Sequence, residues 1–300
     1  MVVILGRIFR KLGKYGFLNF IADKTYIKIL YRLFMKQKLD LIHPKSLNEK
    51  IQWLKLYDRK EIYSKMVDKY TSKEYVSNII GKKYIIPTYG VWDNFDDIDF
   101  DKLPTKFVLK CTHDCGSVIV CKDKYKFNIE FARKRIKKAM SFNYFYVGRE
   151  WAYKNIKPRI IAEQYIEDAG TKDLRDYKFY CFANIVDSVL VCLDRDSGNT
   201  KFYFFDKKWN LKKYNKLSKN LPTKFILTKP NNIDEMFEIA KKLSIASGAP
   251  FLRVDLYNAN GKIYFGELTL YPDCGLDSNR LPETDLYFGG LVKLPSINEM

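Results

Sequence analysis

Four polar side chains near the end of the chain have types and a spacing suited to binding a cation and phosphate groups. Counting by twos along an apparent strand places Arg253 and Asp255 on one face, and the same count along the next strand joins Phe265, Glu267 and Thr269. Two carboxylates on one sheet face are costly unless a cation or proton lies between them. Such oxygen ligands suit Mg²⁺, which keeps several waters and shares its shell with substrate phosphates. A hairpin with a solvated polar face fits the same spacing.

A β-hairpin must position these residues. Phe251–Tyr257 alternates apolar and β-branched residues, Asn258–Gly261 has turn residues, and Lys262–Leu270 alternates again. We therefore expect Arg253, Asp255, Glu267 and Thr269 to converge on one wall. The opposite face carries three apolar residues that we expect to be buried behind it: Val254, Leu256 and Leu268.

A second candidate site is a short loop between two predicted strands, Lys106–Lys110 and Val118–Cys121. A lysine at a strand end, followed by a loop with Gly116 and Ser117, can hold a phosphate through backbone N–H groups, one hydroxyl and the ammonium of Lys110. No helix follows the loop, so it is not a Walker motif. An ordinary hairpin turn is the alternative.

Two further segments predict strands that carry charged residues. Pro158–Ile166 has an apolar run typical of a buried strand, and the run ends at Glu163. In Asp173–Phe182 the alternation places Asp176, Lys178 and Tyr180 on one face.

The pattern R-V-D-(x)11-E-L-T-(x)2-P, from Arg253 to Pro272, resembles the end of the ATP-grasp fold, where an Arg, an Asp and a Glu-x-Asn close the nucleotide site. The stretch FLRVDLYNANGKIYFGELTLYP is similar to the TupA-like ATP-grasp family, which is associated with teichuronopeptide and other cell-surface polysaccharide synthesis. The resemblance extends over roughly residues 45 to 295. Thr269 departs from the wider superfamily, where Asn is common at that position.

The resemblance implies a role for each candidate residue. Phosphate binding falls to Lys69, Lys110, Gly116 and Ser117, with the loop as a flap over the triphosphate, and adenine binding to Glu163, Gln164 and Ile166. Mg²⁺ would be held by Asp255, Glu267 and Thr269, and catalytic roles fall to Arg253, Lys178 and Arg175. Lys69 is singled out by the resemblance alone, since a surface lysine is the ordinary expectation in so basic a chain.

The fold expected from the resemblance is an α/β ATP-grasp fold, with two α+β subdomains that clamp the nucleotide and a basic helical N-terminal extension. The expected ranges are 1–60 for the extension, 61–100 for the segment leading into the fold, 101–166 for the small clamp subdomain and 167–300 for the large subdomain with the metal site. Borders are expected near Asp99–Leu103 and just after Glu163.

The expected function is that of an ATP-dependent carboxylate–amine ligase with ATP and Mg²⁺, acting on a saccharide and an amino acid or related amine. Three alternatives stay open. A glycosyltransferase would use Asp194-Arg195-Asp196 as its metal-binding motif, although the βαβ context is missing. A kinase would use the same ATP site, and a non-catalytic binding module would depend on the basic N-terminus.

Charge is concentrated at the start of the chain. The net charge is +18, and residues 1–60 carry 14 Lys/Arg against 4 Asp/Glu. Such asymmetry points to an anionic partner, although codon drift in an AT-rich genome raises the lysine content as well. Met1–Asp40 predicts basic amphipathic helices with aromatic anchors, which either contact an anionic membrane or pack on their own domain. We expect membrane contact rather than nucleic acid.

The N-terminus and the cysteines fit a cytoplasmic protein that is peripheral at the inner face of the membrane. Met1–Leu5 is too short for the apolar core of a signal peptide before the charges begin, and no apolar run is long enough to span a bilayer. The chain has six cysteines, and the spacing of Cys111, Cys115 and Cys121 around His113 matches no common zinc pattern.

Overall fold

The structure, a computed structural model, describes residues 2–170, 174–194, 198–222 and 225–296. Within these ranges the helices are α1 Val2–Lys14, α2 Asp23–Met35, α3 Leu47–Tyr57, α4 Ile62–Val67, α5 Thr71–Ile80, α6 Ile129–Met140, α7 Phe145–Gly148, α8 Lys216–Lys219, α9 Ile233–Ser247 and α10 Pro282–Leu291. The strands are β1 Thr88–Trp92, β2 Phe107–Cys111, β3 Ile119–Cys121, β4 Ile160–Gln164, β5 Asp176–Phe182, β6 Ile185–Leu193, β7 Lys201–Phe205, β8 Leu211–Lys212, β9 Leu252–Ala259 and β10 Lys262–Thr269.

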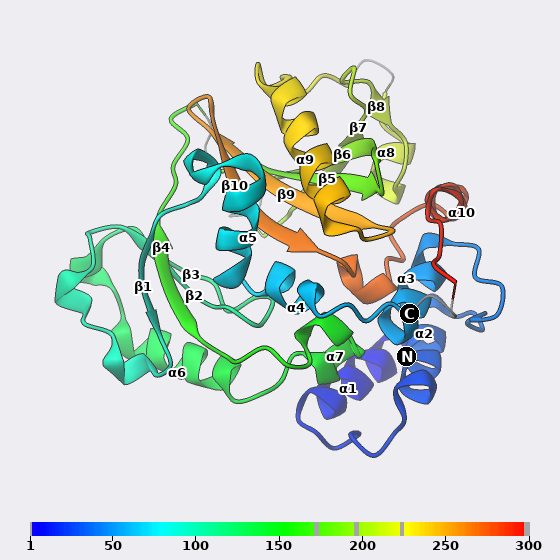
Figure 1. Cartoon of the computed structure of the whole chain (residues 1–300), viewed down its shortest axis with the longest axis horizontal. Coiled ribbons are helices and arrows are strands. Elements are labelled where there is room, and N and C mark those ends of the chain that lie inside the picture. The colour runs from blue at the N-terminus through cyan, green and yellow to red at the C-terminus, as the bar shows by residue number, and fades with distance from the viewer. Residues whose placement is uncertain (1, 171–173, 195–197, 223–224, 297–300) are drawn as a thin grey trace.

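The strands form two antiparallel sheets (Figure 1). The small sheet has the order β1-β4-β2-β3, and the large sheet has the order β10-β9-β5-β6-β7-β8. An isolated bridge between Ile85 and Phe265 joins the segment before β1 to β10. Because β1 belongs to the small sheet, that sheet uses chain from both sides of the border expected at Asp99–Leu103. The domain ranges themselves stay a prediction.

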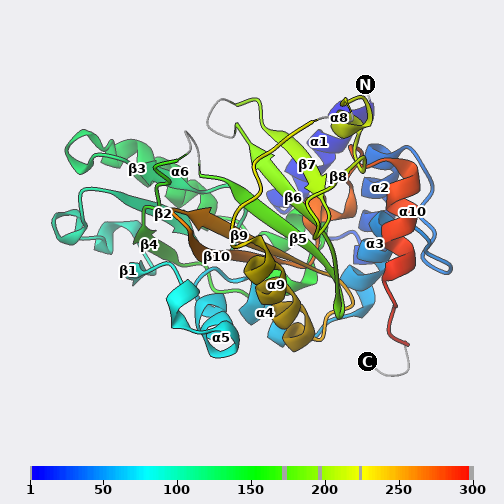
Figure 2. The same ribbon diagram turned by 90° about the horizontal axis from the view of Figure 1, so that it is seen from above.

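Helix α9 covers one face of the large sheet, with α5 beside it (Figure 2). The strand β5 is buried along its whole length, and its Phe179 contacts Phe237 of α9 edge-on at a ring-centroid distance of 5.0 Å. Alternation along β5 turns Lys178 to the opposite face. Burial of the apolar residues under α9 therefore fixes which side chains face the candidate site.

The N-terminal helices pack on the body of the protein. Four residues of α2 are buried in the same hydrophobic core as the large sheet: Tyr26, Ile27, Leu30 and Tyr31. Helix α1 approaches closely through its glycines, because a Cβ at Gly6 would lie 2.7 Å from Phe34 and a Cβ at Gly13 would lie 2.2 Å from the Tyr26 hydroxyl. Ser46 and Glu49 form a capping box at the start of α3.

The predicted hairpin at the end of the chain is confirmed, with one difference. A β-bulge at Gly266 shifts the register, so that Phe265 pairs with Leu256 whereas Glu267 pairs with Asp255. The prediction that Phe265 shares a face with Glu267 and Thr269 is therefore wrong. The extra residue of the bulge turns Phe265 into the core, where it is 3% exposed.

Candidate functional site

The hairpin brings the predicted residues together on one wall of the large sheet. Arg253 donates from Nε to Asp255 Oδ1 at 2.7 Å and from Nη2 to Asp255 Oδ2 at 2.7 Å. The same Nη2 lies 3.0 Å from Glu267 Oε1 and 3.0 Å from Thr269 Oγ1. The predicted burial of Val254, Leu256 and Leu268 behind this wall is also observed.

Lys178 extends the wall across β5. Its ammonium lies 2.6 Å from an oxygen of Asp176 and also contacts Asp255, the Cα partner of Lys178 on β9. Burial alone would lower the pKa of Lys178, but Asp176 and Asp255 raise it well above its usual value. The buried carboxylates of Asp176 and Asp255 thus form one ion-pair network with the cations of Lys178 and Arg253.

Glu267 is the member of this wall that a ligand can reach, since its side chain is 38% exposed. Burial raises the pKa of Glu267, but four cations lower it to about 2: Arg253, Lys178, Lys69 and Lys110. Glu267 is therefore ionised at neutral pH. Lys110 belongs to β2 of the small sheet and Lys69 to the segment between α4 and α5. Glu267 of the large sheet is therefore under the electrostatic influence of cations from both of these segments.

The loop between β2 and β3 lies over this wall. Lys69 donates to the backbone carbonyl of Asp114, and its own backbone N–H bonds to Thr112 at 3.0 Å. The Ser117 hydroxyl donates to Asp114 at 2.6 Å and accepts from the Cys111 N–H at 2.9 Å, so it closes the loop on itself. Gly116 has φ of +106°, a conformation that favours glycine. Lys69, Gly116 and Ser117 are thus gathered in one loop region.

Lys110 pairs with Glu163 across the small sheet. The Glu163 carboxylate is buried, contacts Lys110 and lies 2.5 Å from Lys73. Burial raises the pKa of Glu163, but Lys110 and Lys73 outweigh it and leave the pKa below its usual value. Lys73 is a candidate that the sequence analysis missed. Its position in the first turn of α5, four residues after Lys69, is the only signal that points to it.

The predicted adenine-binding residues are divided between two environments. Ile166 forms a small apolar cluster with Ile86 and Ala259, which is completed by three partly buried residues: Leu174, Tyr257 and Tyr264. Gln164 is exposed, and its N–H bonds to the Pro87 carbonyl at 3.0 Å. The apolar cluster is suited to covering a flat ring, whereas the Glu163 side chain faces the lysines.

Two candidates lie away from the wall. Arg175 bonds to Tyr177, a residue that alternates onto the face of β5 opposite Lys178. Of the Asp194-Arg195-Asp196 motif only Asp194 lies within the described residues, and it pairs with Lys201 at 3.0 Å. The structure therefore brings neither Arg175 nor Asp194 to the convergence of Arg253, Lys178 and Glu267.

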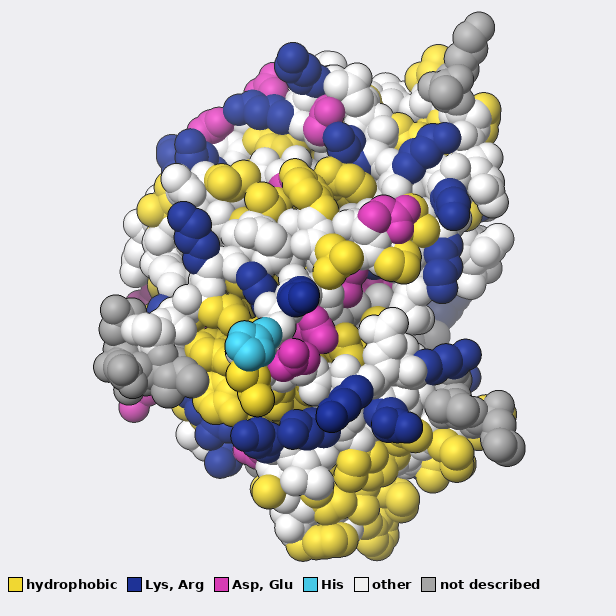
Figure 3. Space-filling view, turned by 90° about the vertical axis from the view of Figure 1, so that its right-hand side faces the viewer, with side chains coloured by type: hydrophobic (Ala, Val, Ile, Leu, Met, Phe, Trp, Pro, Cys, Tyr) yellow, Lys and Arg dark blue, Asp and Glu magenta, His cyan; other side chains and the backbone are white. Residues whose placement is uncertain are grey.

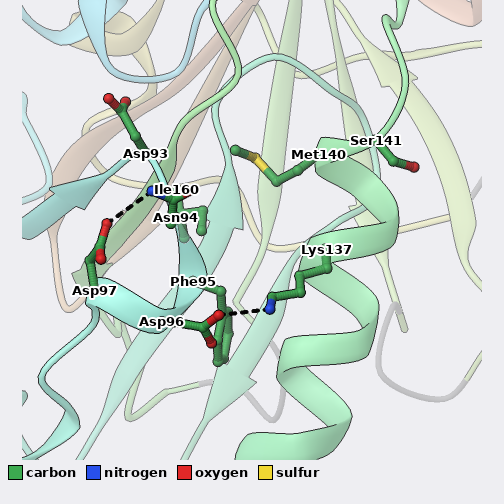
Figure 4. Close-up of a pocket in the computed structure, with 9 residues that line it drawn as sticks. All are labelled: Asp93, Asn94, Phe95, Asp96, Asp97, Lys137, Met140, Ser141 and Ile160. Carbon is green, nitrogen blue, oxygen red and sulfur yellow. Dashed lines mark hydrogen bonds and ion pairs between the residues drawn. The ribbon is translucent and has the colours of Figure 1, made fainter.

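A cavity of about 560 Å³ lies apart from this wall, between the segment Asp93–Asp97 and α6 (Figure 4). Its acidic groups already have partners, because Asp96 accepts from Lys137 at 2.7 Å and Asp97 from Asn94 at 3.2 Å. Neither apolar enclosure nor an unpaired charge marks it as a binding site, so volume alone does not identify the chemistry here.

Glu267 is the carboxylate of the wall that is open to a magnesium ion, because both oxygens of Asp255 already accept from Arg253 and Lys178. Within the described ranges no three His, Cys, Asp or Glu side chains are grouped to hold a metal. Asp255 and Glu267 stand opposite each other across two strands, and one or two carboxylates completed by phosphates and water are the usual donors for Mg²⁺. The Thr269 hydroxyl donates to Glu267 Oε1 at 3.2 Å and orients that carboxylate.

Comparisons with solved structures found weak likenesses to several ligases and synthetases. D-alanine–D-alanine ligase from Helicobacter pylori is 18% identical with a TM-score of 0.44, and the alignment covers 84% of this chain and 70% of that protein. D-alanyl-alanine synthetase A from Vibrio cholerae is 11% identical with a TM-score of 0.46, and the alignment covers 90% of this chain and 69% of that protein. N5-carboxyaminoimidazole synthetase from Staphylococcus aureus, complexed with ADP, is 14% identical with a TM-score of 0.44, and the alignment covers 91% of this chain and 65% of that protein. All three TM-scores lie below 0.5, so no conclusion about this chain is drawn from these likenesses.

A comparison with curated proteins found no match. The model of the family described as TupA-like ATPgrasp matches residues 49–293, which is most of the chain. This match confirms the fold and the enzyme class expected from the sequence, those of the ATP-dependent carboxylate–amine ligases. The chain belongs to the TupA-like ATP-grasp family.

Proposed function

We propose that the protein attaches an amino acid or related amine to a cell-surface polysaccharide or its precursor, through an acyl phosphate. The observation that carries the proposal is the wall of Arg253, Asp255 and Glu267 under a loop held by Lys69. A carboxylate oxygen of one substrate attacks the γ-phosphorus of ATP and ADP leaves. The amine nitrogen then attacks the acyl carbon, phosphate leaves, and the amine gives up a proton.

The residues of the wall and the loop supply positioning and charge rather than a covalent nucleophile. In this proposal Lys69 and Lys110, both of which lower the pKa of Glu267, would hold the triphosphate, and the apolar cluster at Ile166 would cover the base. Arg253 is suited to stabilising the oxyanion that forms as the amine adds. Glu267 would hold Mg²⁺, which would supply neutralisation of phosphate charge, and Asp255 would join it on giving up part of its pairing with Arg253 and Lys178.

Thermal unfolding with a non-hydrolysable ATP analogue, with and without Mg²⁺, tests this site. A ligand at about 100 times its Kd stabilises the native state by about 2.7 kcal/mol. We expect a Mg²⁺-dependent rise in Tm for the wild type and its loss in Glu267→Gln. As a control, Glu238→Gln removes an exposed carboxylate that pairs with Lys207 at 3.0 Å, and we expect it to keep the full shift.

The same experiment separates the alternatives. No shift with the ATP analogue, together with a shift from a sugar nucleotide, would overturn the ligase proposal in favour of a glycosyltransferase. For a protein that does bind ATP, release of ADP without formation of an amide would indicate a kinase. Screening of amines and acidic saccharides then follows from the wild-type result.

We further propose that α1 contacts an anionic membrane surface. Packing through the glycines leaves the opposite side of α1 in solvent, with Ile4 61%, Ile8 49% and Leu12 40% exposed. Phe17 and Phe20, just after the helix, are 67% and 84% exposed. Figure 3 shows a hydrophobic patch at its lower edge, bordered by Lys and Arg side chains. Exposed apolar side chains beside cations are typical of a helix that lies in the headgroup region.

Vesicle flotation tests this contact. Within the described residues no helix is long and apolar enough to cross a bilayer. We expect the wild type to float with vesicles that contain phosphatidylglycerol and to stay behind with neutral ones. The change Ile8→Ser/Phe20→Ser should abolish flotation, whereas Ile245→Ser/Leu286→Ser, at residues that are 55% and 54% exposed elsewhere, should not. Equal flotation of both double variants would refute membrane contact through α1.

A further inference from the structure

A cavity of about 340 Å³ lies between α1, α6 and the loop that covers the wall. Four cationic residues line it: Arg10 and Lys14 from α1, and Arg135 and Lys138 from α6. Cys115 and Gly116 of the loop form another part of the lining. The cavity is therefore assembled from three segments that are distant in sequence, and each segment presents cations or backbone polar groups to it.

The cations of this cavity outnumber the described carboxylates near them, of which Glu150 acts electrostatically on Arg10. Within the described ranges none of the four forms an ion pair. Arg135 donates to the Gly116 carbonyl at 2.9 Å, and the Lys14 ammonium lies 3.7 Å from the centre of the Phe142 ring. The acidic side chain in the lining, Asp114, already accepts from the Ser117 hydroxyl. Positive charges that outnumber the nearby carboxylates repel each other, and a bound anion would relieve that repulsion.

The loop that lines the cavity also borders the nucleotide wall. Lys69, one of the cations that lower the pKa of Glu267, donates to the Asp114 carbonyl next to Cys115. A molecule in the cavity would therefore lie across the loop from the phosphates of ATP. In the proposed reaction, the saccharide substrate would have to approach the phosphates from this side.

Part of the cavity lies outside the family match. Helix α1 precedes the matched residues 49–293, so Arg10 and Lys14 belong to the N-terminal extension, whereas Arg135 and Lys138 belong to the matched region. Arg10 and Lys14 are partly buried, whereas Arg7 and Lys11 on the same helix are exposed to solvent. The extension thus divides its cations between the cavity and the solvent-facing side.

We propose that this cavity binds an acidic saccharide unit of the acceptor through its carboxylate or phosphate group, with Arg10, Lys14 and Lys138 as the anion ligands. The inference rests on the proposed function, because it assigns the substrate class of the same site. Cations from two helices can surround a sugar-sized anion from two sides. The polar carbonyl side of the loop leaves room for its hydroxyl groups.

Binding of defined saccharides by calorimetry tests the inference. The probes are trigalacturonate, its methyl ester as the uncharged control, and glucose 6-phosphate as the phosphate source. We expect trigalacturonate, glucose 6-phosphate or both to bind the wild type and the methyl ester to bind at least about tenfold more weakly. Binding of trigalacturonate would identify a carboxylate as the anionic group that the cavity recognises, and binding of glucose 6-phosphate would identify a phosphate.

Two matched double variants locate the site. Arg10→Gln/Lys138→Gln removes two charges from the cavity, and Arg7→Gln/Lys11→Gln removes two charges from the exposed side of α1. We expect the first to weaken saccharide binding at least about tenfold and the second to change it less than about twofold. Lys138→Gln alone, at an exposed position, serves if the Arg10 variant does not fold.

A second readout needs no variant. Cys115 is exposed, whereas the other five cysteines are buried, so a neutral maleimide should modify Cys115 first. The acidic saccharide should slow this modification and the methyl ester should not. Equal binding of acid and ester, equal loss in both double variants, or no binding of either acid at millimolar concentration would overturn the inference. Because the ATP-analogue shift is measured separately, its absence would count against the proposed function instead.

Discussion

Replacement of Lys178 by Met is expected to lower the free energy of unfolding by about 3–5 kcal/mol, because it leaves buried carboxylates without their cation. The Lys178 ammonium contacts Asp255 and lies 2.6 Å from Asp176, and the side chains of both aspartates are at most 3% exposed. Arg253 can still pair with Asp255, but Asp176 would lose its contact with the Lys178 ammonium. Methionine fills the volume of the lysine stem without replacing its charge.

Urea unfolding of the wild type and two variants measures this effect. The control, Lys207→Met, breaks an exposed pair with Glu238 of 3.0 Å, where both side chains are more than half exposed. Exposed pairs contribute about 0–1 kcal/mol, so the control should be nearly neutral. A loss for Lys178→Met no larger than that of the control would mean that Asp176 and Asp255 are not held ionised by Lys178. Addition of Asp176→Asn to Lys178→Met should restore part of the stability, since it removes one of the stranded charges.

The wall was accessible to prediction because it depends on alternation along strands. Period-two spacing identified Arg253 with Asp255 and Glu267 with Thr269, and the apolar residues between them were found buried. Alternation failed at Phe265, where the bulge at Gly266 inserts one residue and reverses the faces. A bulge is a property of two paired strands, and nothing in a single strand's pattern marks it apart from the glycine.

Residues that act across elements could not be derived in the same way. Lys73 reaches Glu163 from a helix, and that contact depends on how α5 docks on the small sheet. Similarly, the apolar residues of α1 form a pattern that fits a buried helix as well as an exposed one. Only the close packing at Gly6 and Gly13 decides which side faces inward. Sequence periodicity gives the face of an element, whereas the partner of that face is set by tertiary packing.

Glu163→Gln is expected to destabilise the ligand-free protein by about 3 kcal/mol and to respond more strongly to ATP than the wild type does. The substitution removes the carboxylate that joins Lys73 and Lys110, whose side chains are only 13% and 14% exposed. Two neighbouring ammonium groups would then lack an anion, which costs about as much as breaking other buried pairs. The amide keeps the shape of the side chain, so the loss measures charge rather than packing.

An ATP analogue should reverse much of this loss. Under the proposed function, the triphosphate in the wild type would share Lys110 with Glu163, and the Glu163 carboxylate would repel the phosphates. In the variant the phosphates alone would neutralise the lysines. We therefore expect the rise in Tm caused by the analogue to be larger in Glu163→Gln than in the wild type. Glu167→Gln, four residues further on, removes an exposed carboxylate that pairs with Lys106 at 2.8 Å, and both of its Tm values should stay close to those of the wild type.

This comparison decides what Glu163 does. The resemblance places Glu163 among the residues that contact adenine, whereas its contacts with Lys73 and Lys110 place it on the phosphate side. A residue that binds adenine would take part of the analogue's stabilising effect with it, so the rise in Tm would become smaller in the variant. A carboxylate that holds the lysines until ATP arrives gives the opposite sign. Whether the analogue-induced rise in Tm becomes larger or smaller in Glu163→Gln therefore separates the two roles, and the measurement needs no substrate other than the ATP analogue.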